Sequence, residues 1–299
     1  MSAIEDLEVA IIKAGVLSEA LPYIRRFAGS VFVVKYGGNA MADSSEEATL
    51  ESFARDVVLM ASVGIKPVVV HGGGPQIGEM LARRAIESRF ENGLRVTDAA
   101  TLEVVQMVLM GKVNPEIVAA INRFAPLAVG LSGADTGLII AEPAPGELGF
   151  VGEVESINPE IVERLLGEGM IPVVATVGVD RGGQAYNINA DVVAGAIAGA
   201  IRAEKLIYLT NVEGIYANYP DPASLVRRIS SGGLLRMLES GSATAGMIPK
   251  LRSCLDALEA GVGSAHILDG RMEHSLLLEI FTDSGIGTMV VTGDQGGME

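Results

Sequence analysis

Short apolar runs alternate with amphipathic stretches along the 299-residue chain. The apolar runs are rich in β-branched residues, as in strands that are buried on both faces. They predict strands at 31–34, 67–70, 127–131, 171–177, 206–210, 266–268 and 289–292. Helical periodicity predicts helices at 4–23, 44–61, 99–124, 192–201 and 273–281, and others that begin near Gln76, after Asn158 and at Gly246. This order of elements indicates an α/β fold with one body and two lobes.

Three features modify this pattern. Pro22 is expected to bend or end the first helix, and Gly111 and Pro115 are expected to split the helix at 99–124. Residues 138–155 are expected to form hairpins over one face. The first helix either packs at the edge of its own subunit or contacts another copy of the chain, and the pattern does not choose between the two.

Two glycine-rich turns follow predicted strands. One begins at Lys35 and reads KYGG, and the other begins at His71 and reads HGGGP. Ligands of open α/β sheets bind outside the carboxyl ends of the strands, and glycine amides can approach a phosphate closely. A lone lysine at a strand end is more often a solvated charge, but three consecutive glycines favour a function over a plain turn. The turns therefore predict an anion site.

Three further segments place polar groups where a site can form. Arg95 precedes the amino end of the helix at 99–124, where a guanidinium can clamp a carboxylate. Asn187, Asn189 and Asp191 alternate just before a helix, a pattern that also fits a turn with a helix cap. Lys250 lies in the first turn of a helix, where the dipole disfavours a cation, so an anion is expected beside it.

Composition narrows the partners and the location. The net charge of −15 disfavours nucleic acid and anionic membrane surfaces, and the absence of tryptophan disfavours base stacking. No apolar run reaches the ~18 residues of a membrane-spanning helix. The single cysteine, Cys254, and the acidic amino-terminal residues predict a cytoplasmic protein. His71 is interpreted as structural, since no second histidine or cysteine lies at metal-ligand spacing, and no metal site is expected.

Taken together, six motifs resemble those of the amino acid kinase family. They are KYGGNAM at Lys35, HGGGPQI at His71, GLRVTD at Gly93, NINAD at Asn187, LTNVEG at Leu209 and GMIPK at Gly246. The resemblance is strongest with the members that phosphorylate N-acetyl-L-glutamate in arginine biosynthesis. It implies a three-layer α/β/α sandwich with a mainly parallel central sheet. It also implies an amino-terminal oligomerisation helix at 1–29, an acceptor-binding lobe at 30–205 and a nucleotide-binding lobe at 206–299.

The resemblance assigns a role to each motif, with ATP and Mg²⁺ as the phosphoryl donor. The implied catalytic residues are Lys35, Lys250 and Asp191, with the aspartate orienting the two lysines. The implied acceptor site is Gly73, Gly74, Arg95 and Asn187. The implied phosphate and nucleotide site is Gly37, Gly38, Thr210, Asn211 and Gly214. The chain departs from the family pattern at Ala134, Thr136 and Asn211, where lysine, glycine and aspartate are common.

Two other functions and one form of regulation stay open. A kinase for aminoadipate or glutamate carried on a small protein would need a basic surface, which the net charge disfavours. A non-catalytic arginine or nucleotide sensor would have lost Lys35, Asp191 or Lys250, and all three are present. The first helix and the tail at 274–285 resemble those of arginine-inhibited hexameric members. That resemblance implies an arginine site at Lys205, His266 and Glu279 and a hexamer built as a trimer of dimers.

Overall fold

An eight-stranded sheet forms the centre of the computed structural model, which describes residues 3–37, 46–91, 93–218, 221–241, 243, 246–283 and 285–293. The strand order is β14-β16-β15-β11-β1-β2-β8-β5. Their bounds are Val31–Tyr36 (β1), Lys66–His71 (β2), Ala128–Ser132 (β5), Ile171–Ala175 (β8), Lys205–Thr210 (β11), Arg228–Ser230 (β14), Ser264–Asp269 (β15) and Thr288–Val291 (β16). All neighbours run parallel except β15 and β16, which confirms a mainly parallel sheet.

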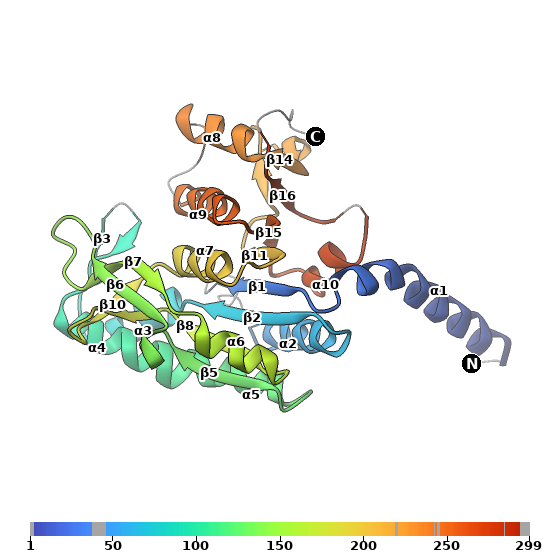
Figure 1. Ribbon diagram of the computed structural model, residues 1–299, viewed down its shortest axis with the longest axis horizontal. Helices are drawn as coiled ribbons and strands as arrows, with labels where there is room; N and C mark the ends of the chain where they lie inside the picture. Colours follow the sequence, from blue (N-terminus) through green and yellow to red (C-terminus); the bar gives the residue numbers. More distant parts are fainter. Residues whose placement is uncertain are drawn as a thin grey trace.

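Helices cover both faces of this sheet (Figure 1). In β1 the side chains of Phe32, Val34 and Tyr36 join one core cluster, whereas Val33 joins the other, because successive strand residues point to opposite faces. The first cluster packs under α2 (Glu46–Ser62), α3 (Gly74–Arg83), α4 (Ala99–Val108), α5 (Asn114–Asn122) and α10 (Ser275–Ile280). The second packs under α6 (Glu160–Gly167), α7 (Ala190–Ala200), α8 (Ser231–Glu239) and α9 (Ile248–Glu259). The predicted three layers are therefore confirmed.

Short strands outside the main sheet were only partly predicted. The expected hairpin is present as β6 (Ile139–Pro143) and β7 (Val151–Ile157), and these close into a small barrel with β9 (Val177–Val179) and β10 (Ala185–Ile188). The single strand expected at 171–177 is wrong, because the chain leaves β8 at Ala175 and enters the barrel as β9. Two further sheets have two strands each: β3 (Phe90–Glu91) with β4 (Leu94–Arg95), and β12 (Ile215–Tyr216) with β13 (Leu225–Val226).

Helix α1 (Ala3–Phe27) is longer than predicted and projects from the body (Figure 1). It continues through Pro22 rather than ending there. Proline has a helical φ and costs the helix one hydrogen bond, and the burial of Phe27 in the core offsets that cost. Val16, Leu17 and Leu21 are 60%, 70% and 52% exposed, so this helix presents apolar side chains to solvent.

The helix at 99–122 is continuous and is not split at Gly111 and Pro115 as predicted. A π-helical turn, Leu109–Val113, joins α4 to α5, and Pro115 lies in the first turn of α5. By length and hydropathy these 24 residues can cross a membrane, a property that the sequence analysis missed because charged residues interrupt the apolar runs. Half of the most apolar window is buried inside the protein, as in a core helix.

Other helix ends shift by a few residues from their predicted places. Asn189 caps α7, which therefore begins at Ala190 instead of Val192 and includes Asp191 in its first turn. Ser44, the predicted start of α2, lies outside the described residues. The division into lobes at 205/206 stays a prediction, since β11 pairs with β1 on one side and β15 on the other and the sheet continues across it.

Candidate active site

A cavity of about 720 Å³ opens at the carboxyl ends of β1, β2 and β11. It is bordered by the first turns of α3, α7 and α9 and by the β3–β4 hairpin. The predicted residues that line it are Lys35, Gly37, Gly73, Gly74, Arg95, Asn187, Asp191, Thr210, Asn211 and Lys250. Segments that lie more than 200 residues apart in the chain thus meet in one place, because parallel strands end at the same edge of the sheet.

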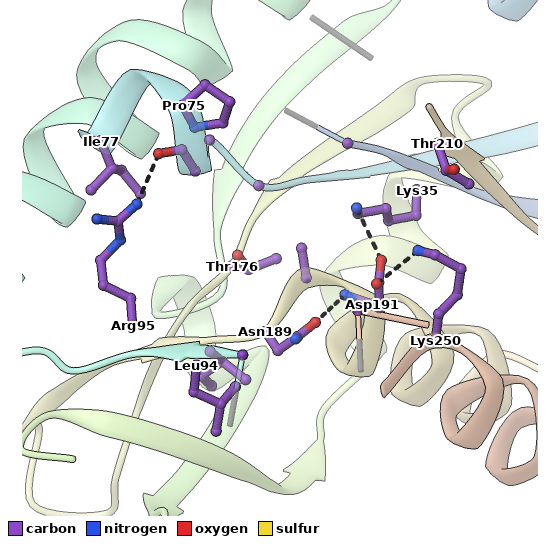
Figure 2. Close-up of a pocket in the computed structure, with 18 of the residues that line it drawn as sticks. Lys35, Pro75, Ile77, Leu94, Arg95, Thr176, Asn189, Asp191, Thr210 and Lys250 are labelled. Atoms are coloured by element: carbon purple, nitrogen blue, oxygen red, sulfur yellow. Dashed lines mark hydrogen bonds and ion pairs between the residues drawn. The ribbon is translucent and has the colours of Figure 1, made fainter. Parts of the chain in front are cut away.

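Two lysines share one carboxylate in the wall of this cavity. Lys35 Nζ lies 2.9 Å from Asp191 Oδ1, and Lys250 Nζ donates to Asp191 Oδ2 at 2.8 Å (Figure 2). The three side chains are 13%, 7% and 13% exposed for Lys35, Lys250 and Asp191. Asp191 is the anion that the sequence analysis expected beside Lys250.

The charges of this cluster depend on one another. Burial by itself would raise the pKa of Asp191, but the charges of Lys35 and Lys250 outweigh burial and hold that pKa well below its usual range. Burial lowers the pKa of Lys250, and the neighbouring Asp191 opposes this effect. Asp191 therefore stays ionised near neutral pH, holds both lysine side chains at the wall of the cavity and has no proton to transfer.

The glycine turn after β2 forms the opposite wall. Gly73 caps the amino end of α3, and the carbonyl oxygen of Gly74 accepts a hydrogen bond from Arg95 Nη2 at 2.9 Å. Arg95 also donates to Ser88 Oγ and lies 4.6 Å above the ring of Phe90. Burial lowers the pKa of Arg95, which lines the cavity. The amides of a helix start and a fixed guanidinium make this wall suited to an anionic group.

The floor of the cavity carries amide and hydroxyl groups. Asn187 Nδ2 donates to Thr97 Oγ1 at 3.1 Å, and Asn189 Oδ1 accepts from the amide of Asp191 at 2.8 Å. Asn189 is thus the helix cap that the sequence allowed, and it lines the cavity together with Asn187 and Asp191. Thr176 also lines the cavity and was missed by the sequence analysis, although its position between two apolar runs was a visible signal.

The nucleotide residues are only partly brought together. Thr210 and Asn211 line the cavity, and Gly37 lies so close to Lys35 that a Cβ there would be 2.8 Å from Nζ. Gly214 is not among the lining residues and packs against Thr288 instead. Gly38 lies outside the described residues. The role of each glycine stays a prediction.

The three residues predicted to bind arginine form a separate buried cluster. Lys205 Nζ lies 2.9 Å from His266 Nε2, and His266 Nδ1 lies 2.6 Å from Glu279 Oε1. Glu279 Oε2 accepts from the amides of Ile286 and Gly287. The ring of Phe27, at the end of α1, lies 5.3 Å from Lys205 Nζ. The cluster therefore connects the end of α1 to the segment between α10 and β16.

Comparison with known proteins places this geometry in a family. Residues 30–269 match the model of the amino acid kinase family. The chain is 52% identical to the acetylglutamate kinase of Caldanaerobacter subterraneus subsp. tengcongensis over 282 residues, 94% of this chain and 93% of that protein. It is 55% identical to the acetylglutamate kinase of Thermosynechococcus vestitus over 278 residues, 92% of this chain and 93% of that protein.

Solved structures agree with this placement. N-acetylglutamate synthase from Neisseria gonorrhoeae, complexed with coenzyme A and N-acetyl-glutamate, is 28% identical with a TM-score of 0.83 and matches 94% of this chain. The same synthase with coenzyme A and L-arginine is 26% identical with a TM-score of 0.78 over 94% of this chain. This chain covers 63% and 65% of those two chains. Sequence motifs, sheet order and relatives lead to one conclusion: the chain belongs to the amino acid kinase family.

Proposed function

We propose that this protein transfers the γ-phosphoryl group of ATP to the γ-carboxylate of N-acetyl-L-glutamate, in arginine biosynthesis. The cluster of Lys35, Asp191 and Lys250 is the observation that carries the proposal. Many relatives that match this chain over nearly its whole length are acetylglutamate kinases. Phosphoryl transfer to a carboxylate gives an acyl phosphate and needs no protein nucleophile, so positioned cations suffice.

The two lysines act on the group in transfer. As the bond to the β-phosphate breaks, negative charge spreads over the phosphoryl oxygens and the leaving group. Lys35 reaches the cavity from strand β1 and Lys250 from helix α9 (Figure 2). The two ammonium groups neutralise that charge from two sides. Asp191 holds both side chains in place before the substrates arrive, so little reorganisation is needed during the reaction.

The acceptor and the nucleotide occupy opposite parts of the cavity. Arg95 binds the α-carboxylate of the acceptor, Asn187 binds its acetamido group, and the amides of Gly73 and Gly74 face the γ-carboxylate. Thr210 and Asn211 line the nucleotide part. Within the described part of the chain no group of three acidic, histidine or cysteine side chains is placed to hold a metal, so Mg²⁺ would be held mainly through the phosphates of ATP, whose charge it neutralises.

A coupled ADP-release assay tests this proposal. N-acetyl-L-glutamate, glutamate, aspartate, carbamate, uridylate and a carrier protein bearing aminoadipate are compared as acceptors at equal concentration. N-acetyl-L-glutamate should give the highest kcat/KM. A higher value for the carrier-linked acceptor would establish the alternative function, and ADP release with no acceptor would establish neither.

We further propose that the protein is a cytoplasmic hexamer that arginine inhibits. The exposed apolar side chains of α1 would be buried between dimers, and the Lys205, His266 and Glu279 cluster would receive the effector. Glu279 can pair with the guanidinium, and Lys205 can pair with the carboxylate. Because Phe27 contacts Lys205, the site is connected to the helix that would build the ring. The L-arginine complex of the related synthase supports this choice of effector.

Light scattering and inhibition assays test the two halves separately. The full chain should have the mass of a hexamer, and arginine at millimolar concentration should inhibit it sigmoidally with a coupling of about 1–3 kcal/mol. A chain that begins at Gly29 should be a dimer that arginine does not inhibit. A full-length dimer that is indifferent to arginine would end this hypothesis and leave the kinase proposal unchanged.

A further inference from the structure

A buried histidine contacts the glycine turn after β2 from outside the cavity. His71, the last residue of β2, is 0% exposed, does not line the cavity and has no role in the reaction described above. Its Nδ1 lies 3.0 Å from the carbonyl oxygen of Gly72, and its Nε2 lies 3.0 Å from Nδ2 of Asn114. Both ring nitrogens are therefore occupied, one by the turn and the other by helix α5.

The partners of Asn114 determine where the histidine proton lies. Asn114 Nδ2 donates to the carbonyl oxygen of Val173 at 2.8 Å, which fixes the amide nitrogen on this side of the side chain. The second hydrogen has His71 Nε2 at 3.0 Å and the carbonyl oxygen of Leu131 at 3.5 Å, and because an amide nitrogen only donates, His71 Nε2 must accept. The partner of His71 Nδ1 is the carbonyl oxygen of Gly72, which can only accept, so Nδ1 must carry the hydrogen and donate it. The network thus selects the neutral imidazole with its proton on Nδ1, and burial favours the same state by lowering the pKa of His71 to about 4.

The π-helical turn that precedes α5 contacts the glycine turn directly. A Cβ at Gly73 would lie 2.7 Å from Leu109 Cδ2 and 3.2 Å from Val113 Cγ2, so the two side chains are packed against the turn. Leu109 and Val113 are the first and last residues of the π-helical turn, and Asn114 follows it at once. One irregular segment therefore supplies three contacts to residues 71–73. Such π-helical turns inside α-helices frequently occur at functional sites.

We infer that His71 is a positioning residue, held by Asn114, which fixes the Gly72 peptide so that the amides of Gly73 and Gly74 point at the γ-carboxylate of the acceptor. The expected effect on kcat rests on the proposed kinase reaction, whereas the hydrogen bonds of His71 do not depend on it. Without the hydrogen bond from His71 the peptide after Gly72 can rotate, because a glycine has no Cβ to restrict its φ and ψ angles. Misplacing catalytic donors by about 1 Å costs up to about 100-fold in rate.

The proton position can be measured without any assay of activity. Long-range ¹H–¹⁵N spectra of the three imidazoles, assigned with His266→Gln and His274→Gln, report which nitrogen carries the proton. His71 should be protonated on Nδ1 and should not titrate between pH 8 and pH 5.5. Protonation on Nε2, or a titration near the ordinary pKa of histidine, would overturn the inference whatever the reaction turns out to be.

Two amides on α5 provide matched variants for the kinetic test. Asn114→Leu removes the donor to His71, whereas Asn122→Leu removes an amide whose hydrogen bonds, among the described residues, go to the backbone of Ala128. Both should lower the melting temperature. Only Asn114→Leu should lower kcat, by about 10- to 100-fold, with the KM for ATP changed less than threefold. Equal kcat values for the two variants, measured well below both melting temperatures, would show that Asn114 is structural only.

Substitutions of the histidine itself separate its two bonds. The amide nitrogen of asparagine can occupy the place of Nδ1 and donate to Gly72, whereas that of glutamine reaches the place of Nε2. His71→Asn should therefore retain more kcat than His71→Gln. The reverse order would show that the bond to Gly72 does not position the turn.

Discussion

The sharpest test of the site is the replacement of Asp191 by asparagine. This change removes the negative charge between Lys35 and Lys250 and keeps the size of the side chain. Unit charges 2.9 Å apart attract by about 6 kcal/mol at an effective dielectric constant of 20. Desolvation offsets much of this attraction, and the removal of one partner from a buried pair costs about 3–5 kcal/mol. If the loss falls on the transition state, kcat decreases by about 10²- to 10⁴-fold.

A surface pair provides the control for this magnitude. Arg181 Nη2 lies 2.6 Å from Glu155 Oε1, a distance as short as those in the cluster, but its side chain is 76% exposed. Glu155→Gln should change kcat by less than twofold and the free energy of unfolding by less than about 1 kcal/mol. The comparison thus separates the effect of burial from that of distance.

The assay is coupled ADP release at saturating ATP and N-acetyl-L-glutamate, with circular dichroism to establish that each variant is folded. Lys35→Met and Lys250→Met are measured alongside Asp191→Asn. Residues that act as a unit should give losses that are far from additive when combined. A folded Asp191→Asn enzyme with kcat within tenfold of the original would refute the assigned role of the aspartate.

Three further changes test other parts of the structure. Arg95→Lys should raise the KM for the acceptor by at least tenfold and leave the KM for ATP nearly unchanged, because an ammonium cannot replace a planar fork on a carboxylate; equal changes in both would exclude the acceptor role. Burial raises the pKa of Asp56, which pairs with His274, to about 6. Between about pH 4 and 6 the folded protein therefore binds more protons at this group than the unfolded chain does. The free energy of unfolding that this group contributes is present at low pH and is lost as the pH rises through 6. Asp56→Asn should therefore raise the free energy of unfolding at pH 8 by up to about 3 kcal/mol, with a smaller gain at pH 4.5, as measured by urea denaturation. Thr136 has a left-handed φ of 56°, so Thr136→Gly should raise the melting temperature by about 2 °C, and a lower value would show that the strain is absent.

The sequence alone predicted the parallel sheet and ten of the residues that line the cavity. Strands of a buried parallel sheet are rich in apolar, β-branched residues, so they can be recognised in the sequence. Glycines directly after a strand indicate where the backbone approaches a ligand. Lys250 was recognisable as a cation in an unfavourable place, the first turn of a helix, whereas Lys35 gained its meaning from the glycines that follow it. The motifs around them carried the family resemblance, which the comparisons confirm.

Tertiary structure decided the features that depend on distant partners. Helix α1 passes through Pro22 because Phe27 docks in the core, and the break at Thr176 arises because a strand leaves the main sheet for the small barrel. Periodicity could not show either, since both are set by contacts between segments far apart in the chain. The sequence identified His71 as structural, but only the fold brings Asn114 to its Nε2 and places the glycine turn in front of it. The pattern of apolar residues in each segment follows from the face that the segment buries. The position of the proton on His71 follows instead from its two partners in the folded chain, the carbonyl group of Gly72 and the side-chain amide of Asn114.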